Sequence, residues 1–399
     1  MSPSKTLLSV AAIAAATFAL AGCASGTTGG TGSTASQVAI TLTGGSQDTC
    51  ELSTTTAKAG PVTFTVTNKT STAITEVELL SGGRILGEKE NLAPGLSPVS
   101  FTVTLGGGDY QVYCPGAAKE QQTLVVSGQE AAAPTGGVQG LLQQGTDGYA
   151  KYVAGVLDNM TTAVANLNTA VQSGDVEKAK AEYALARPYY ERIESDVDGF
   201  VLPGFKATDN AGNLDYLIDM RASNLDDAVG WHGFHAIERD LWQGGAITDT
   251  TKQLSTELVA NVAKLNTLAA KLTYKPEDLA NGAASLLEEV QSEKIKGEEE
   301  DFSHLDLIDF AANVEGAQQA FAFLEPGVKK IDPDLTKRVN TQFATVTTLL
   351  DKYKDPSAPG GYVTYTAAIR TSDAATLSQA VQALQDPLST VAEKVATAR

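Results

Sequence analysis

The side chains best suited to chemistry lie near the middle of the chain, where His235 and Glu238 stand three residues apart. On a helix, residues i and i+3 lie on one face, so this imidazole and this carboxylate would point the same way. The pair therefore predicts half of a binding site for a divalent or ferric ion. Because the pattern is not His-Glu-x-x-His, a zinc protease of that class would lack its second histidine ligand and its general base. His232, one turn earlier, either joins the site or faces solvent.

The rarity of metal-binding side chains limits where other chemistry can occur. The chain holds three His, three Cys and three Met, and none of the His or Met lies between residues 37 and 128. A blue copper site needs two His and a Cys, so this region cannot form one on its own. It does contain Cys50 and Cys114, which in an exported protein most often pair as a disulfide. The alternative is a thiolate metal site completed by carboxylates of the same region: Glu76, Glu78, Glu88, Glu90 or Asp109.

The overall charge excludes one class of partner. The 399 residues carry 29 Lys and Arg against 47 Asp and Glu, a formal net charge of −18. Nucleic acid requires a basic surface, so we expect no nucleic-acid partner. An acidic balance fits a cationic ligand better, although most of these carboxylates are expected to be solvated. The acidic run at 298–301, Glu-Glu-Glu-Asp, is interpreted in the same way, as a solvated loop, with a low-affinity cation surface as the alternative.

The first residues predict export and a lipid anchor. Residues 1–22 combine one charged side chain with an apolar run that is too short to span a membrane, as in a secretory signal peptide. The sequence Leu20-Ala21-Gly22-Cys23 resembles a bacterial lipobox, so Cys23 would carry lipid after cleavage; an ordinary signal with a chance Cys is the alternative. Residues 23–36 are rich in Gly, Ser and Thr and predict a flexible tether. We therefore expect a protein anchored on the outer, periplasmic or extracellular, face of the cell membrane.

The remainder divides into two parts with different periodicity. Residues 37–127 contain six or seven short stretches that largely alternate apolar and polar residues, which predicts a β-sandwich. Residues 128–140 are a linker by composition. Residues 141–399 show a helical pattern with stops at Gly and Pro, which predicts an all-α helical bundle. The expected helices lie near 144–172, 175–198, 222–243, 250–273, 276–296, 304–325, 333–354 and 373–398.

Several short motifs resemble one protein family. The stretch Gly-Phe-His-Ala-Ile-Glu-x-x-Leu-Trp at 233–242 resembles the Gly-x-His-x-x-Glu signature of the imelysin-like domain. Over residues 37–399 the chain is similar to the EfeO-type family, the exported components of EfeUOB iron-uptake systems, which join a cupredoxin-like β-sandwich to an imelysin-like helical domain. The other matching phrases lie at 190–194, 282–290 and 303–316 in the helical part and at 90–95 and 108–114 in the cupredoxin-like part.

The resemblance implies a set of metal ligands. His235 and Glu238 would be joined by a carboxylate of the pair Glu191 and Glu194, which also stand at i and i+3, and by Asp215. Such a set, one imidazole with carboxylates, suits ferrous or ferric iron better than Cu(I) and leaves room for zinc or manganese. Zinc or copper is the alternative cofactor, and no haem is expected. Further candidates, whose alternative is a cluster at a helix start with supporting hydrogen bonds, are His304 and Asp309.

The resemblance also implies a function. We expect a lipoprotein that captures iron outside the cell and delivers it to a membrane iron permease, and the same system allows an exported haem peroxidase as a further partner. A zinc-dependent metallopeptidase is the alternative, because the imelysin group carries a peptidase label. No residue stands out as the general base that a catalytic zinc site requires, so we do not expect an enzyme.

Overall fold

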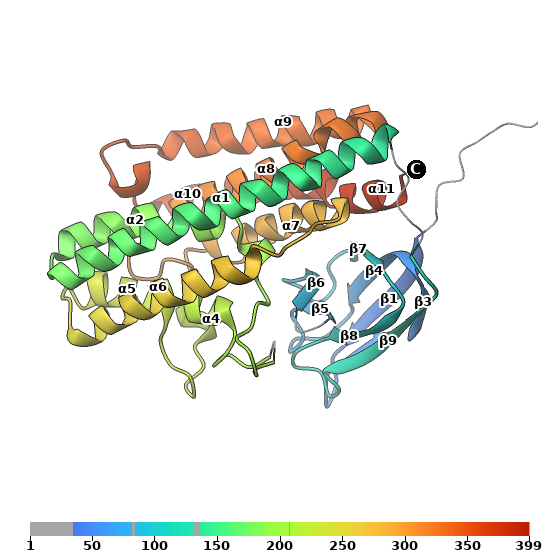
Figure 1. Ribbon diagram of the computed structural model, residues 1–399, viewed down its shortest axis with the longest axis horizontal. Helices are drawn as coiled ribbons and strands as arrows, with labels where there is room; N and C mark the ends of the chain where they lie inside the picture. Colours follow the sequence, from blue (N-terminus) through green and yellow to red (C-terminus); the bar gives the residue numbers. More distant parts are fainter. Residues whose placement is uncertain (1–34, 82–83, 131–135, 207, 399) are drawn as a thin grey trace, which may run out of the picture. The chain divides into compact units, whose positions relative to one another are not determined.

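The computed structural model describes residues 35–81, 84–130, 136–206 and 208–398. A β-sheet part comes first and a helical part follows, which confirms the predicted fold class (Figure 1). The described residues of both parts belong to one compact unit. The predicted signal peptide, Cys23 and nearly all of the tether lie outside the described residues. Within the described ranges, no helix is both long and apolar enough to cross a membrane.

Nine strands of the described chain form two sheets around one apolar core. The sheets have the orders β2-β1-β4-β7 and β3-β9-β8-β5-β6. Alternate residues of a strand point inward, as Val38, Ile40 and Leu42 do in β1, so the period-two pattern of the sequence becomes the core. The strands are β1 (Ser36–Thr43), β2 (Thr49–Leu52), β3 (Thr56–Lys58), β4 (Gly60–Asn68), β5 (Val77–Ser81), β6 (Arg84–Lys89), β7 (Val99–Leu105), β8 (Gly108–Tyr113) and β9 (Gln121–Ser127).

A disulfide ties the two sheets together. It joins Cys50 in β2 to Cys114, the residue after β8, across a sequence separation of 64 residues. The two strands belong to different sheets, so the bond crosses the core of the sandwich. Because the bond uses both sulfur atoms, it leaves no thiolate for a metal ion at this position.

The helical part is built on long helices that pack side by side. The helix α1 packs along α2, α6 and α8 (Figure 1). The helices are α1 (Gly137–Ser173), α2 (Val176–Glu191), α3 (Glu194–Val197), α4 (Leu214–Asp219), α5 (Gly233–Glu238), α6 (Asp249–Ala269), α7 (Pro276–Glu289), α8 (Asp306–Ile331), α9 (Pro333–Leu350), α10 (Ala367–Leu388) and α11 (Val391–Thr397), with short 3₁₀ turns at Ala222–Asn224, Asp351–Tyr353 and Pro359–Gly361.

Some predicted helix ends are wrong. The sequence predicts a stop at Pro326 and Gly327, but α8 continues through both to Ile331. Gly327 is instead a packing residue, because a Cβ there would lie 2.4 Å from Leu142 Cδ2 of α1. Conversely, the helix expected over 175–198 breaks after Glu191, and the helix expected over 222–243 is reduced to α5 and two short turns.

Two π-helical turns directly follow α5 and α7. Arg239–Gln243 continues α5, and Val290–Lys294 continues α7. In the second turn the Ile295 amide donates to the Val290 carbonyl at 3.1 Å, so this hydrogen bond joins residues five apart in the sequence. Single π turns inside helices are often found at functional sites, and both of these adjoin buried charged residues described below.

Candidate metal centre

Gly233 lets the helix that carries His235 approach its neighbour. It opens α5 with φ of 68°, a left-handed conformation that favours glycine. A Cβ at this position would lie 2.0 Å from the carbonyl oxygen of Ile218 in α4, so a larger residue would push the two helices apart. The close approach places His235 next to Asp219, the last residue of α4. The glycine before the histidine motif therefore sets the spacing of two potential ligands.

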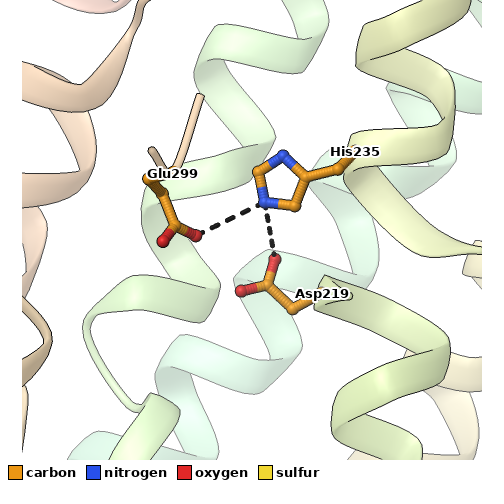
Figure 2. Close-up of side chains that lie close together, drawn as sticks. All are labelled: Asp219, His235 and Glu299. Atoms are coloured by element: carbon orange, nitrogen blue, oxygen red, sulfur yellow. Dashed lines mark ion pairs between the residues drawn. The ribbon is translucent and has the colours of Figure 1, made fainter. Parts of the chain in front are cut away.

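His235 is buried among carboxylates. Its Nδ1 lies 2.9 Å from Glu238 Oε2, while Nε2 lies 3.3 Å from Glu299 Oε1 and 3.6 Å from Asp219 Oδ1. Figure 2 shows the last two carboxylates pointing at the same ring nitrogen. Burial and the Arg187 charge oppose protonation, yet the hydrogen bond to Glu238 and the nearby Glu299 carboxylate raise the pKa of His235 to about 10. A metal ion at Nε2 therefore has to replace a proton.

Glu238 fastens the acidic run to α5. Its Oε1 accepts hydrogen bonds from the backbone amides of Phe302 and Ser303 at 2.9 and 2.6 Å. Its other oxygen faces Nδ1 of His235, which fixes the orientation of the imidazole ring. As the spacing predicts, Glu238 and His235 lie on one face of the helix. Their side chains also contact each other directly through a hydrogen bond.

The prediction that the acidic run at 298–301 is a solvated loop holds for Glu298 and Asp301, which are exposed, and is wrong for the two residues between them. Glu299 and Glu300 are only 1% and 0% exposed. The run turns inward because Glu238 holds the amides that follow it and because buried cations lie beside it; Arg187 contacts both glutamates. Although burial opposes a charge on Glu299, the Lys294 and Arg221 charges hold its pKa well below its usual range. Glu299 therefore contributes a charged carboxylate to the centre.

Glu191 and Asp309 contribute buried oxygens that lack hydrogen-bond partners. Glu191 ends α2, Asp309 lies in the first turn of α8, and both side chains are fully buried. Neither carboxylate has a hydrogen-bond partner among the described residues. Asn313 of α8 donates to the Glu191 carbonyl at 2.9 Å and so holds the two helices together at this point. Burial raises the pKa of Asp309 well above its usual range, and any buried carboxylate that is charged requires a compensating cation.

Arg187 supplies one of the cations. Its guanidinium is 1% exposed and lies among five carboxylates from α2, α4, α8 and the acidic run. The closest contacts include 2.6 Å to Glu191 and 2.5 Å to Glu299. The full set of partners is Glu191, Asp219, Glu299, Glu300 and Asp309.

Among the described residues, three overlapping groups could hold a metal ion. Within each group, one donor atom from each residue lies within 4.8 Å of the others. His235 and Glu299 each belong to two groups, so the groups form one continuous centre. The groups are Asp219, His235 and Glu299; His235, Glu238 and Glu300; and Glu191, Glu299 and Asp309.

The other predicted ligands lie outside these groups. Glu194 faces Lys294 at 3.8 Å. Asp215 accepts a hydrogen bond from Tyr190, and burial raises the pKa of its carboxyl. His304 adopts a left-handed backbone, and its Nδ1 has no partner in the described part of the chain. His232, which the sequence leaves undecided, lies 3.6 Å from Glu257 and is partly exposed.

Sequence reasoning missed Asp219, and it placed Glu299 and Glu300 in a solvated loop with a low-affinity cation surface only as the alternative. Asp219 carries no motif, and only the fold brings α4 against α5. For the two glutamates a signal did exist: a dense acidic run a few residues before His304. Acidic runs are solvated in most proteins, which is why the run predicts a solvated loop. Buried cations elsewhere in the chain can nevertheless compensate the charge of such a run in the interior.

The carboxylates proposed for a second site in the sandwich form no such group. Glu78 of β5 lies opposite Glu88 of β6, and burial together with the neighbouring Glu76 raises the pKa of Glu78 to about 11. Burial and the Glu289 charge likewise raise the pKa of Glu90 well above its usual range. In the described ranges, none of the groups of potential ligands includes a sandwich residue. Glu78 therefore holds a proton at neutral pH rather than acting as a charged ligand.

Comparison with known proteins gives two results. Residues 145–391 match the model of the family described as Peptidase_M75, imelysin. The chain is also 34% identical over 368 residues to the protein named iron uptake system component EfeO of Escherichia coli strain K12, an alignment that covers 91% of this chain and 90% of that protein. The EfeO protein of Shigella sonnei strain Ss046 gives the same values, and that of Escherichia coli strain 536 is 33% identical with the same coverage.

Proposed function

The chain belongs to the imelysin family, as a protein of the EfeO type, and on that premise we propose that it binds iron at the His235 centre and delivers it to a membrane permease. The similar proteins are named components of an iron uptake system, which supports iron as the cargo. Delivery to a permease, cooperation with an exported haem peroxidase, and attachment to the outer face of the cell membrane through Cys23 are parts of the same proposal. The anchor is supported by the lipobox-like sequence.

One observation carries the proposal: the buried centre combines an imidazole with carboxylate oxygens that lack hydrogen-bond partners. His235 offers Nε2, while Glu191 and Asp309 each present two oxygens that have no hydrogen-bond partner among the described residues and are ion-paired with Arg187. Hard cations such as iron prefer oxygen donors with at most a few imidazoles, whereas soft Cu(I) prefers sulfur. The donor set therefore supports ferrous or ferric iron and also accommodates zinc.

A binding function is better supported than peptide cleavage. His235 is 1% exposed and Glu238 is fully buried. A peptide bond cannot reach donors at that depth without a large rearrangement, whereas a metal ion is small. Oε1 of Glu238, which could act as a base, instead accepts hydrogen bonds from two backbone amides. Zinc-dependent cleavage of an unfolded protein substrate by the purified chain would revive the metallopeptidase alternative.

Metal titration of the purified mature chain tests the proposal. Fe²⁺ is added under anaerobic conditions, and heat of binding is compared between wild type and the double variant His235→Ala/Glu238→Ala. We expect saturable binding by wild type and loss of that binding in the double variant. His232→Ala is the matched control, because this histidine lies outside the centre and should leave binding unchanged. Equal binding by the wild type and the double variant would show that the site is assigned to the wrong residues.

A further inference from the structure

Lys294 is a buried cation placed by an unusual turn. It ends the π-helical turn Val290–Lys294 and is fully buried. In a regular α-helix, residues five apart point about 140° away from each other. The wider π turn brings Lys294 back to the face of Glu289, five residues earlier, so that its Nζ lies 3.5 Å from that carboxylate.

Four carboxylates surround the ammonium of Lys294. Their oxygens lie 3.2 to 3.8 Å from Nζ, and they come from the acidic run and from the ends of α2, α3 and α7. Nζ makes no hydrogen bond of good geometry with the described residues, so the contacts are ionic rather than directional. We call this set the Lys294 cage; its members are Glu191, Glu194, Glu289 and Glu299.

The cage and the metal centre share two carboxylates, although Glu299 turns Oε2 to Lys294 and Oε1 to His235. Glu191 and Glu299 belong to the cage and also to a group of potential metal ligands. Buried carboxylates must be compensated by a cation, because an uncompensated charge in a protein interior is costly. An ion that takes these two carboxylates therefore competes with the ammonium for them. Conversely, when the ammonium moves away from these carboxylates, the entering cation supplies the positive charge that they then lack.

We propose that Lys294 is an internal competitor of the cargo ion: its ammonium neutralises the cage until a multivalent cation displaces it. The inference rests on the proposed function, because it concerns how that same centre is loaded. The four-carbon stem of lysine is flexible, so Nζ can leave the cage while the backbone stays in place. Lys294 thereby determines which ions bind as well as how tightly they bind.

Selectivity follows from the covalent attachment of the competitor. The ammonium is tethered to the turn, so its effective concentration at the cage is far above that of a dissolved monovalent ion. Na⁺ or K⁺ brings the same charge and gains nothing by exchange. A divalent or trivalent ion brings more charge to the two shared carboxylates and can displace the ammonium. We therefore expect Lys294 to exclude weakly competing cations from the centre.

The test removes the charge while keeping the side-chain length. Binding of Fe²⁺ is measured anaerobically by calorimetry on the mature chain for wild type, Lys294→Met and Lys294→Arg, and binding of Ca²⁺ is measured in parallel. We expect Lys294→Met to bind Fe²⁺ at least about tenfold more tightly and to acquire Ca²⁺ binding that wild type lacks. Lys294→Arg keeps a cation with a rigid fork and should bind Fe²⁺ at least about tenfold more weakly. Lys296→Met, an exposed neighbour, is the control and should match wild type.

The outcomes separate this inference from the proposed function. Equal or weaker binding by Lys294→Met than by wild type overturns the competitor role and leaves iron binding intact. Absence of Fe²⁺ binding in wild type and in every variant overturns both. If Lys294→Met does not fold, Lys294→Arg decides, because unchanged affinity in that variant is incompatible with competition for the cage.

Discussion

Replacing Arg187 by methionine should destabilise the helical part strongly and make its stability depend on a bound metal ion. Arg187 is the buried partner of five carboxylates, and methionine keeps much of its volume without its charge. The guanidinium also stacks over Phe234 with its carbon 5.5 Å from the ring centre, a contact that the methionine side chain can partly retain. The substitution therefore tests mainly the loss of the positive charge.

The size of the effect follows from burial. Removing one partner of a buried ion pair typically costs about 3–5 kcal/mol, because the other charge is left uncompensated. For a domain of this size, such a loss corresponds to a fall in melting temperature of roughly 6–20 °C. A metal ion at about 100 times its dissociation constant returns about 2.7 kcal/mol. Metal should therefore raise the melting temperature of the variant more than that of wild type, because the ion replaces a missing cation.

The assay is thermal unfolding followed by circular dichroism at pH 7, with and without Fe²⁺ under anaerobic conditions. Arg338→Met, which removes an exposed arginine of α9, is the matched control and should unfold within about 2 °C of wild type. If Arg187→Met unfolds as late as that control, the carboxylates around it are protonated rather than charged. In that case the account of a charge-compensated centre is wrong.

Three further changes test other parts of the structure. Burial raises the pKa of Asp196 to about 7 from 3.8. The stability that this carboxyl contributes is therefore complete below about pH 4 and is lost as the pH rises through 7. In urea unfolding, wild type should lose stability relative to Asp196→Asn over that pH interval. Reducing the Cys50–Cys114 bond, which spans 64 residues, should lower the unfolding free energy of the sandwich by about 4 kcal/mol in guanidinium titrations, and an unchanged midpoint would mean that the bond does not form. Gly316→Ala places a Cβ 2.2 Å from a carbonyl oxygen of the α2 end and should cost about 1–3 kcal/mol, whereas Gly155→Ala, with nothing within 4 Å, should stabilise by about 0.5–1 kcal/mol; equal effects would refute the packing argument.

The sequence predicts the architecture well because its periodicities are local. Alternation along β1 and the helical pattern along α1 or α6 each depend on neighbours a few residues away. The same locality explains the errors at helix ends. Pro326 and Gly327 are strong stop signals, yet α8 continues because its packing against Leu142 of α1 overrides them.

The centre was predictable only where ligands are close in sequence. His235 and Glu238 stand one turn apart, so their common face could be inferred. Asp219 reaches the imidazole only because Gly233 permits a close approach of two helices, a tertiary fact. Glu299 is buried because Arg187 and other distant cations neutralise it, so its location could not be inferred from a run of acidic letters.

The two amides that bind Glu238 give a local signal of movement in the acidic run. Phe302 and Ser303 both donate to a single carboxylate oxygen, while Glu299 also contacts His235 and Arg187. The positions of Glu299 and Glu300 therefore depend on several contacts together. The amide protons of Phe302 and Ser303, observed by hydrogen exchange, would report the opening of the contact to Glu238.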